Sequence, residues 1–275
     1  MAEQLSTTKR SGFMMGTNPM IRKLSKVRET DASNSCSYAG ITVKLAFFMV
    51  MVLAGVLLNV IMAGKWGGEL LQVDNEILRT ITVNEAIAVG VAALMLVIMP
   101  LISLIRVTIP VSGSLFCAST GFVLSWAGST FGKEYAQTIW LAVIITAIVV
   151  MVMAFLYFTG KVVVTNKFRT ILISLLISTV LASLLMFIGS LIPATRGFVQ
   201  KVASNAVINI GASVLMVIIA TLFLLVDFDT IRHSVEDGLP RKYEWTAAFG
   251  LAFSVIWLFF KVLELLGKLK GNNKS

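Results

Sequence analysis

The chain has 275 residues, of which 57% are hydrophobic and only 13% are charged, and its mean hydropathy is +0.89. A soluble domain carries about a quarter charged residues, so this composition excludes an ordinary soluble protein and predicts an all-α polytopic membrane protein. The net charge of +9 does not indicate nucleic-acid binding, because the basic residues lie mainly in the terminal segments and between apolar runs, where topology signals are found.

The apolar runs divide the chain into three parts. Residues 1–38 are polar with little periodic apolar content, which predicts a disordered N-terminal tail. Residues 39–267 form the predicted transmembrane domain, and residues 268–275 form a short Lys-rich C-terminal tail. In lipid only helices satisfy the backbone of such runs, and each run is close to the ~20 residues that a span needs. The predicted helices are 39–63, 83–105, 109–130, 135–158, 171–192, 205–227 and 245–267.

The links between the runs set the orientation. Only Arg106 to Thr108 separate the second and third runs, which predicts a tight hairpin. More than half of the 23 Lys and Arg residues fall in the N-terminal tail and in the second, fourth and sixth links, so the positive-inside rule favours a cytoplasmic N-terminus. Seven crossings would then place the Lys-rich C-terminal tail outside, against that rule. A seventh segment that re-enters without crossing is the alternative.

A stripe of polar side chains follows one face of the sixth run. At about 100° per residue, Asn205, Asn209 and Ser213 recur every four positions and share a face. Asp227 follows Asn209 by five turns and returns to this face about 27 Å further along. Such a stripe is costly in lipid, so we expect it to face the bundle interior or a wet cavity, with Asp227 as a titrating or cation-contacting carboxylate. The alternative is that the asparagines cap the helix and Asp227 begins a loop.

Other ionisable residues lie near the ends of the runs. Asp229 points away from the stripe and is predicted at the rim. His233 and Glu236 follow it, but this is the only His in the chain, and a metal site needs three or four ligands. An ion pair between Arg232 and Glu236 at i, i+4 explains these charges better, so no metal is predicted. Glu85 opens the second run, either as a charge that suits a helix N-terminus or as a pore-lining acid.

Motifs that would indicate catalysis are missing from the sequence. The chain has no HExxH, no GxSxG and no Walker glycine loop. An enzyme is therefore the poorer class, and we predict neither catalytic residues nor a cofactor.

The most specific motifs lie in the last third of the chain. The stretch "LVDFDTIRHSVEDGLPRKYEWTAAFGLAFSVIWLFFKVLELL" resembles the C-terminal signature of the Bax inhibitor-1 family, the transmembrane Bax inhibitor motif proteins. It is most similar to the bacterial branch, in which an aspartate pair "DFD", a link of the form G-x-P-x-K/R-Y-x-W and "AAFGL…WL" recur. Two shorter stretches, "TGKVVVTNKFR" at 159–169 and "TNPM" at 17–20, resemble other parts of that branch.

This resemblance carries expectations about fold and activity. It implies a bundle of seven helices in the bacterial inner membrane, with the last helix surrounded by the others. For members with an assigned activity it implies a pH-sensitive calcium leak, closed by a hydrogen bond between an aspartate at the end of the sixth helix and one in the seventh. Asp227 matches the first aspartate. Ser254 stands where the second would be, and a serine cannot share a proton between two carboxylates.

Two functions from different classes follow. The first is a leak protein for calcium or other cations with Asp227 on the path, in which calcium is the transported ion rather than a cofactor. The second is a non-conducting regulator that binds other membrane proteins, such as membrane proteases, through its N-terminal tail and lipid-facing small residues. Calcium flux through liposomes that contain only the purified protein distinguishes the two.

Overall fold

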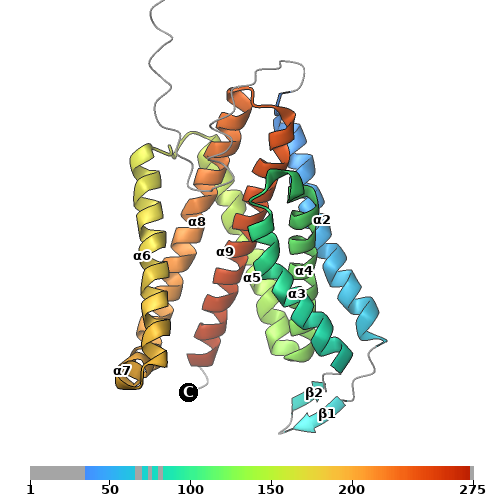
Figure 1. Cartoon of the computed structure of the whole chain (residues 1–275), viewed down its shortest axis with the longest axis vertical. Coiled ribbons are helices and arrows are strands. Elements are labelled where there is room, and N and C mark those ends of the chain that lie inside the picture. Colours follow the sequence, from blue (N-terminus) through green and yellow to red (C-terminus); the bar gives the residue numbers. More distant parts are fainter. Residues whose placement is uncertain (1–34, 66–69, 74–75, 80–82, 273–275) are drawn as a thin grey trace, which may run out of the picture.

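The computed structural model describes residues 35–65, 70–73, 76–79 and 83–272. It confirms the prediction of an all-α membrane bundle, because seven of its helices are long and apolar enough to cross a membrane (Figure 1). These helices are α2 (Tyr38–Ala63), α3 (Val83–Ile102), α4 (Ile109–Thr130), α5 (Lys133–Phe158), α6 (Asn166–Leu191), α8 (Ala206–Glu236) and α9 (Glu244–Asn272).

Short elements connect the long helices. A 3₁₀ turn, Arg106–Thr108, joins α3 to α4, as the predicted tight hairpin requires, and a second one, Arg241–Tyr243, leads into α9. The link between α2 and α3 contains a small antiparallel hairpin of β1 (Leu70–Val73) and β2 (Glu76–Arg79). The link between α6 and α8 is itself a helix, α7 (Pro193–Ser204), which lies between the predicted spans 171–192 and 205–227.

Side-chain caps define where several helices begin. The Ser37 hydroxyl accepts a hydrogen bond from the Gly40 backbone N–H at 3.0 Å at the start of α2. Thr165 caps α6 in the same way, accepting from the Phe168 N–H at 3.2 Å. These side chains satisfy backbone donors that have no partner inside the helix. They fix helix starts that apolar run length alone cannot place.

Three boundaries differ from the prediction by five residues or more. Helix α6 begins at Asn166 rather than residue 171, α8 continues to Glu236 rather than 227, and α9 continues to Asn272 rather than 267. In each case the extra turns are polar, because they pass beyond the hydrocarbon region or are covered by neighbouring helices. Run length therefore underestimates these helices, and the predicted boundary of the C-terminal tail at residue 268 falls inside α9.

The predicted disordered tail, residues 1–38, lies largely outside the described residues. Its last four residues are placed, and they are packed rather than disordered. Ser35 forms a β-bridge with Pro240, the Cys36 backbone N–H donates to the Leu239 carbonyl at 2.6 Å, and α2 already begins at Tyr38. The predicted boundary at residue 38 therefore falls within a hydrogen-bonded part of the described chain.

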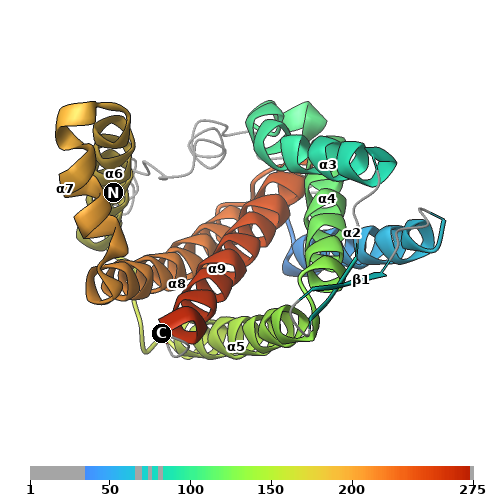
Figure 2. The same ribbon diagram turned by 90° about the horizontal axis from the view of Figure 1, so that it is seen from below.

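Helix α9 occupies the centre of the bundle, as the family resemblance implied. It packs against α2, α5 and α8, with fewer contacts to α4. Seen from below, α9 runs between these helices (Figure 2). Within its most apolar stretch 56% of the residues are buried inside the protein, against 6% for α6, and Ala248, Ala252 and Leu258 are fully buried. The chain therefore covers α9 with protein and leaves α6 mostly to lipid.

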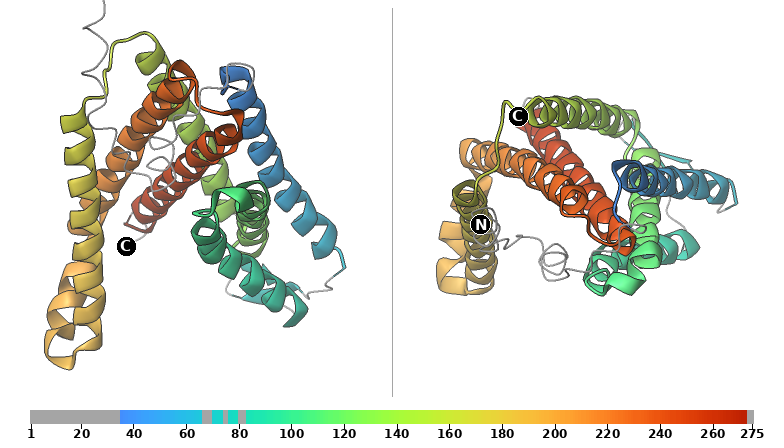
Figure 3. Two further views of the ribbon diagram at one scale, coloured as in Figure 1. Left: turned by 45° about the horizontal axis from the view of Figure 1, so that its top comes forward. Right: turned by 90° about the horizontal axis from the view of Figure 1, so that it is seen from above.

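The two ends of the bundle carry different parts of the chain. Helix α2 begins at the upper end in Figure 1, where α5 and α8 end and α6 and α9 begin, whereas the C-terminus lies at the lower end. Seen from above, α6 lies outside α8 and takes no part in surrounding α9 (Figure 3). Because α9 has 29 residues and runs from the upper to the lower end, it matches a full crossing rather than a re-entrant segment.

A close helix crossing joins α2 to α4 at two glycines. A Cβ atom at Gly55 would lie 1.9 Å from the Ala118 carbonyl oxygen, and one at Gly121 would lie 1.9 Å from the Val52 carbonyl oxygen. The two backbones therefore touch directly, which only glycine permits. This contact holds α4 against α2 on one side of α9.

Candidate functional site

Asp227 lies in the second half of α8, against the central helix. Its exposed fraction is 6%, and Ser254 of α9, also buried, is its neighbour on the central helix. The carboxylate Oδ2 atom has no hydrogen-bond partner within the described part of the chain. The residues that match the two family aspartates therefore meet, and they leave one buried carboxylate oxygen unsatisfied.

Asp229 lies inside the bundle, and its predicted place at the rim was wrong. The Tyr157 hydroxyl of α5 donates to its Oδ1 atom at 3.0 Å, and the Arg169 guanidinium of α6 forms an ion pair with its Oδ2 atom. All three residues are buried. His233 Nδ1 lies 2.7 Å from the Asp229 carbonyl oxygen and 3.6 Å from Oδ2. Because α8 continues past residue 227 and both α5 and α6 reach its end, protein covers both faces of these turns.

Ser213 lies on the interior face, as predicted, but far from Asp227. Lys268 of α9 donates to its hydroxyl oxygen at 2.7 Å and to Glu264 at 2.8 Å. Lys261 donates to the same Glu264 carboxylate at 2.9 Å. Ser213 and Asp227 are fourteen residues apart on α8, or about 21 Å. The face therefore carries two separate polar clusters, one near each end of the α8–α9 contact.

The other two members of the predicted stripe do not line the interior. Asn205 precedes α8 as its N-cap, where its side chain accepts from the Ile208 N–H at 3.1 Å, and it is exposed. The Asn209 side chain donates to the Ala203 carbonyl at the end of α7. The capping alternative is thus right for Asn205, and the interior prediction is wrong for both asparagines. Their hydrogen bonds go to the sharp turn between α7 and α8.

An apolar layer separates the two polar clusters. On α8 it contains Ala220 and Leu224, and on α9 it contains Leu258, all with 0% exposure. These residues belong to one continuous hydrophobic core around the central helix. A close-packed apolar layer excludes water and ions. The α8–α9 contact is therefore continuous apolar packing between the two polar clusters.

The remaining predicted residues form hydrogen bonds or ion pairs away from Asp227. Glu85, in the first turn of α3, is buried and accepts a hydrogen bond from the Trp126 indole N–H of α4 at 3.0 Å, at the opposite end of the bundle from Asp227. The predicted ion pair of Arg232 with Glu236 is confirmed at 2.6 Å. Across the described ranges, no group of three His, Cys, Asp or Glu residues comes together as metal ligands do.

A cluster that sequence reasoning missed surrounds Glu244 at the start of α9. Glu244 has 0% exposure. Its carboxylate accepts hydrogen bonds from the Ser37 backbone N–H at 3.0 Å and from the Lys44 ammonium at 2.5 Å. A Cβ atom at Gly40 would lie 2.2 Å from the carboxylate, so Gly40 leaves room for the carboxylate in its observed position. The one signal in the sequence was Lys44, a charge inside an apolar run that needs a partner.

Residues 35–37, which we call the strap, tie the N-terminal segment to the link before α9. We expect Cys36 in the strap to react slowly with maleimide while the protein is folded. Burial, with a contribution from the Glu244 carboxylate, raises the pKa of its thiol to about 11, so very little reactive thiolate exists at pH 7. Timed labelling of a Cys117→Ala protein, read by mass spectrometry, isolates Cys36. Glu244→Gln should loosen the strap and speed labelling by roughly tenfold, whereas rapid labelling without that change would contradict the packing.

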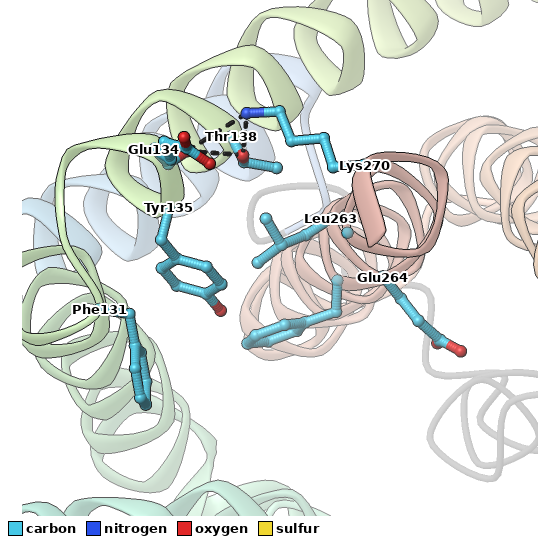
Figure 4. Close-up of a pocket in the computed structure, with 9 residues that line it drawn as sticks. Phe131, Glu134, Tyr135, Thr138, Leu263, Glu264 and Lys270 are labelled. Atoms are coloured by element: carbon cyan, nitrogen blue, oxygen red, sulfur yellow. Dashed lines mark hydrogen bonds between the residues drawn. The ribbon is translucent and has the colours of Figure 1, made fainter. Parts of the chain in front are cut away.

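At the lower end, a pocket of about 800 Å³ opens where α5 begins and α9 ends. Aromatic walls come from Phe131, Tyr135 and Phe260. The Lys270 ammonium reaches across to donate to the Thr138 hydroxyl at 2.8 Å (Figure 4). The pocket is lined by Phe131, Glu134, Tyr135, Thr138, Phe260, Leu263, Glu264, Gly267 and Lys270. Since Glu264 also belongs to the Ser213 cluster, that cluster borders the pocket.

The comparisons with known proteins agree with the motifs of the last third. A model of the family described as Bax inhibitor 1 like matches residues 18–271, which include every described helix except the last residue of α9. No curated protein matches the chain. Because the match covers nearly the whole chain, and the bundle has the central last helix that the resemblance implied, the chain belongs to the Bax inhibitor 1 like family.

Proposed function

We propose that this protein is a cation leak channel in which Asp227 is the ion-contacting and pH-sensing group. The observation that carries the proposal is the unsatisfied Oδ2 atom of this buried carboxylate. A buried polar atom without a partner costs stability, and ionisable residues inside membrane bundles are typically found on ion or proton paths. Asp229, two residues away, has protein partners at both oxygens. Asp227 is therefore the carboxylate that is available to a cation or a proton.

The proposed path runs along the α8–α9 contact between the two polar clusters. At one end Asp227 and Ser254 supply oxygen ligands, which hard cations such as calcium prefer. At the other end Ser213 donates to Glu264, which lines the pocket at the start of α5. The apolar layer of Ala220, Leu224 and Leu258 closes the path between them, so conduction requires α8 and α9 to separate there. This scheme assigns the chain no enzymatic step and needs no cofactor.

The proposal includes the setting of the protein. We place it in the bacterial inner membrane with the N-terminus in the cytoplasm, on the basis of the excess of Lys and Arg in the N-terminal tail and in the links on that side. Asp227 then lies toward the cytoplasmic end of the path. Calcium is the ion to test first, because the family resemblance implies it.

The decisive experiment measures calcium flux into liposomes that contain only the purified protein, from pH 5 to pH 8. Asp227→Asn keeps the shape and removes the charge. The attraction between unit charges 4 Å apart is about 4 kcal/mol at an effective dielectric constant of about 20, so we expect flux to fall by at least about tenfold. Flux through the parent protein should rise with pH as the carboxyl ionises, and the variant should show no such rise.

Asp237→Asn is the matched control, because it removes the same charge from an exposed position at the end of the same helix. It should leave the flux and its pH dependence unchanged. Ser254→Asp should add a second, coupled titration step and sharpen the pH response, whereas Ser254→Asn should not. If the parent protein passes no calcium at any of these pH values, or if Asp227→Asn leaves the flux unaffected, the channel proposal fails.

One feature favours the second candidate function, a non-conducting regulator of other membrane proteins. Among the described elements, only α7 and α8 make more than marginal contacts with α6. Residues such as Ile171, Leu185 and Phe187 are exposed along this helix. A partner helix could pack on this side. Absence of calcium flux in the same liposome experiment would favour this function.

A further inference from the structure

Helix α7 has a position that its connections restrict closely. Helix α6 ends at Leu191 and α7 begins at Pro193; α7 then ends at Ser204 and α8 begins at Ala206. Both neighbours are membrane spans, and one residue on either side leaves no linker that could carry α7 away from the bilayer. Seen from below, α7 runs across the view beside the end of α6 (Figure 2). It therefore lies at the membrane surface, at the end of the bundle opposite the strap.

The sequence of α7, "PATRGFVQKVAS", divides into two faces at about 100° per residue. Ala194, Phe198 and Val202 recur every fourth position along the apolar face. Arg196, Gln200 and Ser204 lie on the opposite, polar face, and Lys201 lies beside Ala194 at the edge of the apolar face. The helix contains no acidic residue, so all of its charged side chains are basic. Basic amphipathic helices of this kind lie in the membrane interface.

The contacts of α7 leave its most apolar side chain uncovered. Thr195 donates to the Gly189 carbonyl at 2.7 Å, and a Cβ atom at Gly189 would lie 3.0 Å from Val199, so one edge of α7 is docked on α6. Phe198, however, is 69% exposed, and no residue of α7 is buried. Protein contacts within the described chain therefore cover only one edge of the apolar face of α7. Phe198 faces outward at the level of the bilayer surface.

We propose that α7 is an interfacial helix that binds anionic phospholipid headgroups. In this arrangement Phe198 inserts into the boundary between headgroups and acyl chains, and Arg196 and Lys201 contact lipid phosphates. Neither basic side chain forms an ion pair with a described residue, so both are available to lipid. Charge complementarity and the fixed position between two spans identify the partner as a lipid surface rather than a soluble protein. The inference is independent of whether the protein conducts ions.

Thermal unfolding of the full-length protein in detergent tests the lipid specificity. Added phosphatidylglycerol should raise the melting temperature more than the same amount of phosphatidylcholine, because a ligand that binds only the folded state stabilises it. Arg196→Gln/Lys201→Gln should abolish that difference. Lys65→Gln/Lys133→Gln is the matched control, since it removes two exposed basic charges from the same end of the bundle, and it should keep the difference. Equal effects of the two lipids on the parent protein, or an unchanged difference in the α7 variant, would overturn the proposal.

A second measurement tests insertion directly and distinguishes lipid from a protein partner. Phe198→Cys and Gln200→Cys place a bimane label on opposite faces of α7, in vesicles that contain phosphatidylglycerol. Both native cysteines are buried, so the introduced thiol is the reactive one. Brominated lipid should quench the label at 198 and iodide should not, with the reverse at 200. A label at 198 that iodide quenches as strongly as the label at 200 would show that this face does not enter the bilayer.

Discussion

Gly121→Ala and Gly55→Ala should each destabilise the folded protein by about 3 kcal/mol, near the upper end of what overpacking normally costs. The added methyl group would lie 1.9 Å from a backbone carbonyl oxygen of the facing helix in both cases, and a backbone atom cannot move aside as a flexible side chain can. Alanine gains up to about 1 kcal/mol over glycine in helix propensity, which is too little to offset the clash. Helices α2 and α4 must therefore move apart.

Two other glycines in the spans provide the control. A Cβ atom at Gly90 of α3 or at Gly211 of α8 would meet no atom within 4 Å. Gly90→Ala and Gly211→Ala should be neutral or stabilise the protein by up to about 1 kcal/mol. Thermal unfolding of the four purified variants in one detergent measures the difference. The double variant Gly55→Ala/Gly121→Ala should cost less than the sum of the single ones, because both act on one crossing. If Gly121→Ala is as stable as Gly90→Ala, the close crossing is wrong.

Asp229→Asn and Arg169→Met should each cost about 3–5 kcal/mol of folding stability, which is the usual effect of removing one partner of a buried ion pair. The remaining charge is left without its partner among buried side chains of α5, α6 and α8. This pair supplies the strongest polar link between α6 and α8 in the described chain, and α6 has few other contacts with the bundle. The loss should therefore appear as an early loosening of α6, measurable by hydrogen exchange of its backbone amides.

The exposed pair on the same helix is the control. Arg232 and Glu236 lie 2.6 Å apart with about half of each side chain exposed, and such pairs contribute at most about 0.5 kcal/mol. Glu236→Gln should therefore have a small effect on thermal unfolding. The double variant Arg169→Met/Asp229→Leu should recover much of the loss, since replacing both charges by apolar groups leaves none unpaired. A cost for Asp229→Asn no larger than that for Glu236→Gln would contradict the role of the pair.

The seven spans could be predicted because membrane thickness and the need to satisfy every backbone hydrogen bond act on each run separately. No knowledge of neighbouring helices is required for that step. The short turn at Arg106–Thr108 could be predicted for the same reason, because too few residues remain for any other connection. The central place of α9 and the meeting of Asp227 with Ser254 came from resemblance to the family.

Helical periodicity placed Ser213 and Asp227 correctly and misplaced Asn205, Asn209 and Asp229. Periodicity describes which residues share a face, but it cannot say where the helix begins or what covers the opposite face. Asn205 caps α8 instead of lying within it. Asp229 points away from Asp227 and is buried all the same, because α5 and α6 bring Tyr157 and Arg169 to that side.

The remaining features depend on pairs of residues that are distant in the chain. Gly55 and Gly121 matter because two backbones cross at that point, and Glu244 is satisfied by Ser37 and Lys44, some 200 residues earlier. Run length, composition and periodicity are properties of one segment, so they predict the spans and their apolar surfaces. The packing of helices from different segments around α9 decides which buried charge finds a partner. It also decides which buried charge keeps an oxygen atom without a partner, as Asp227 does.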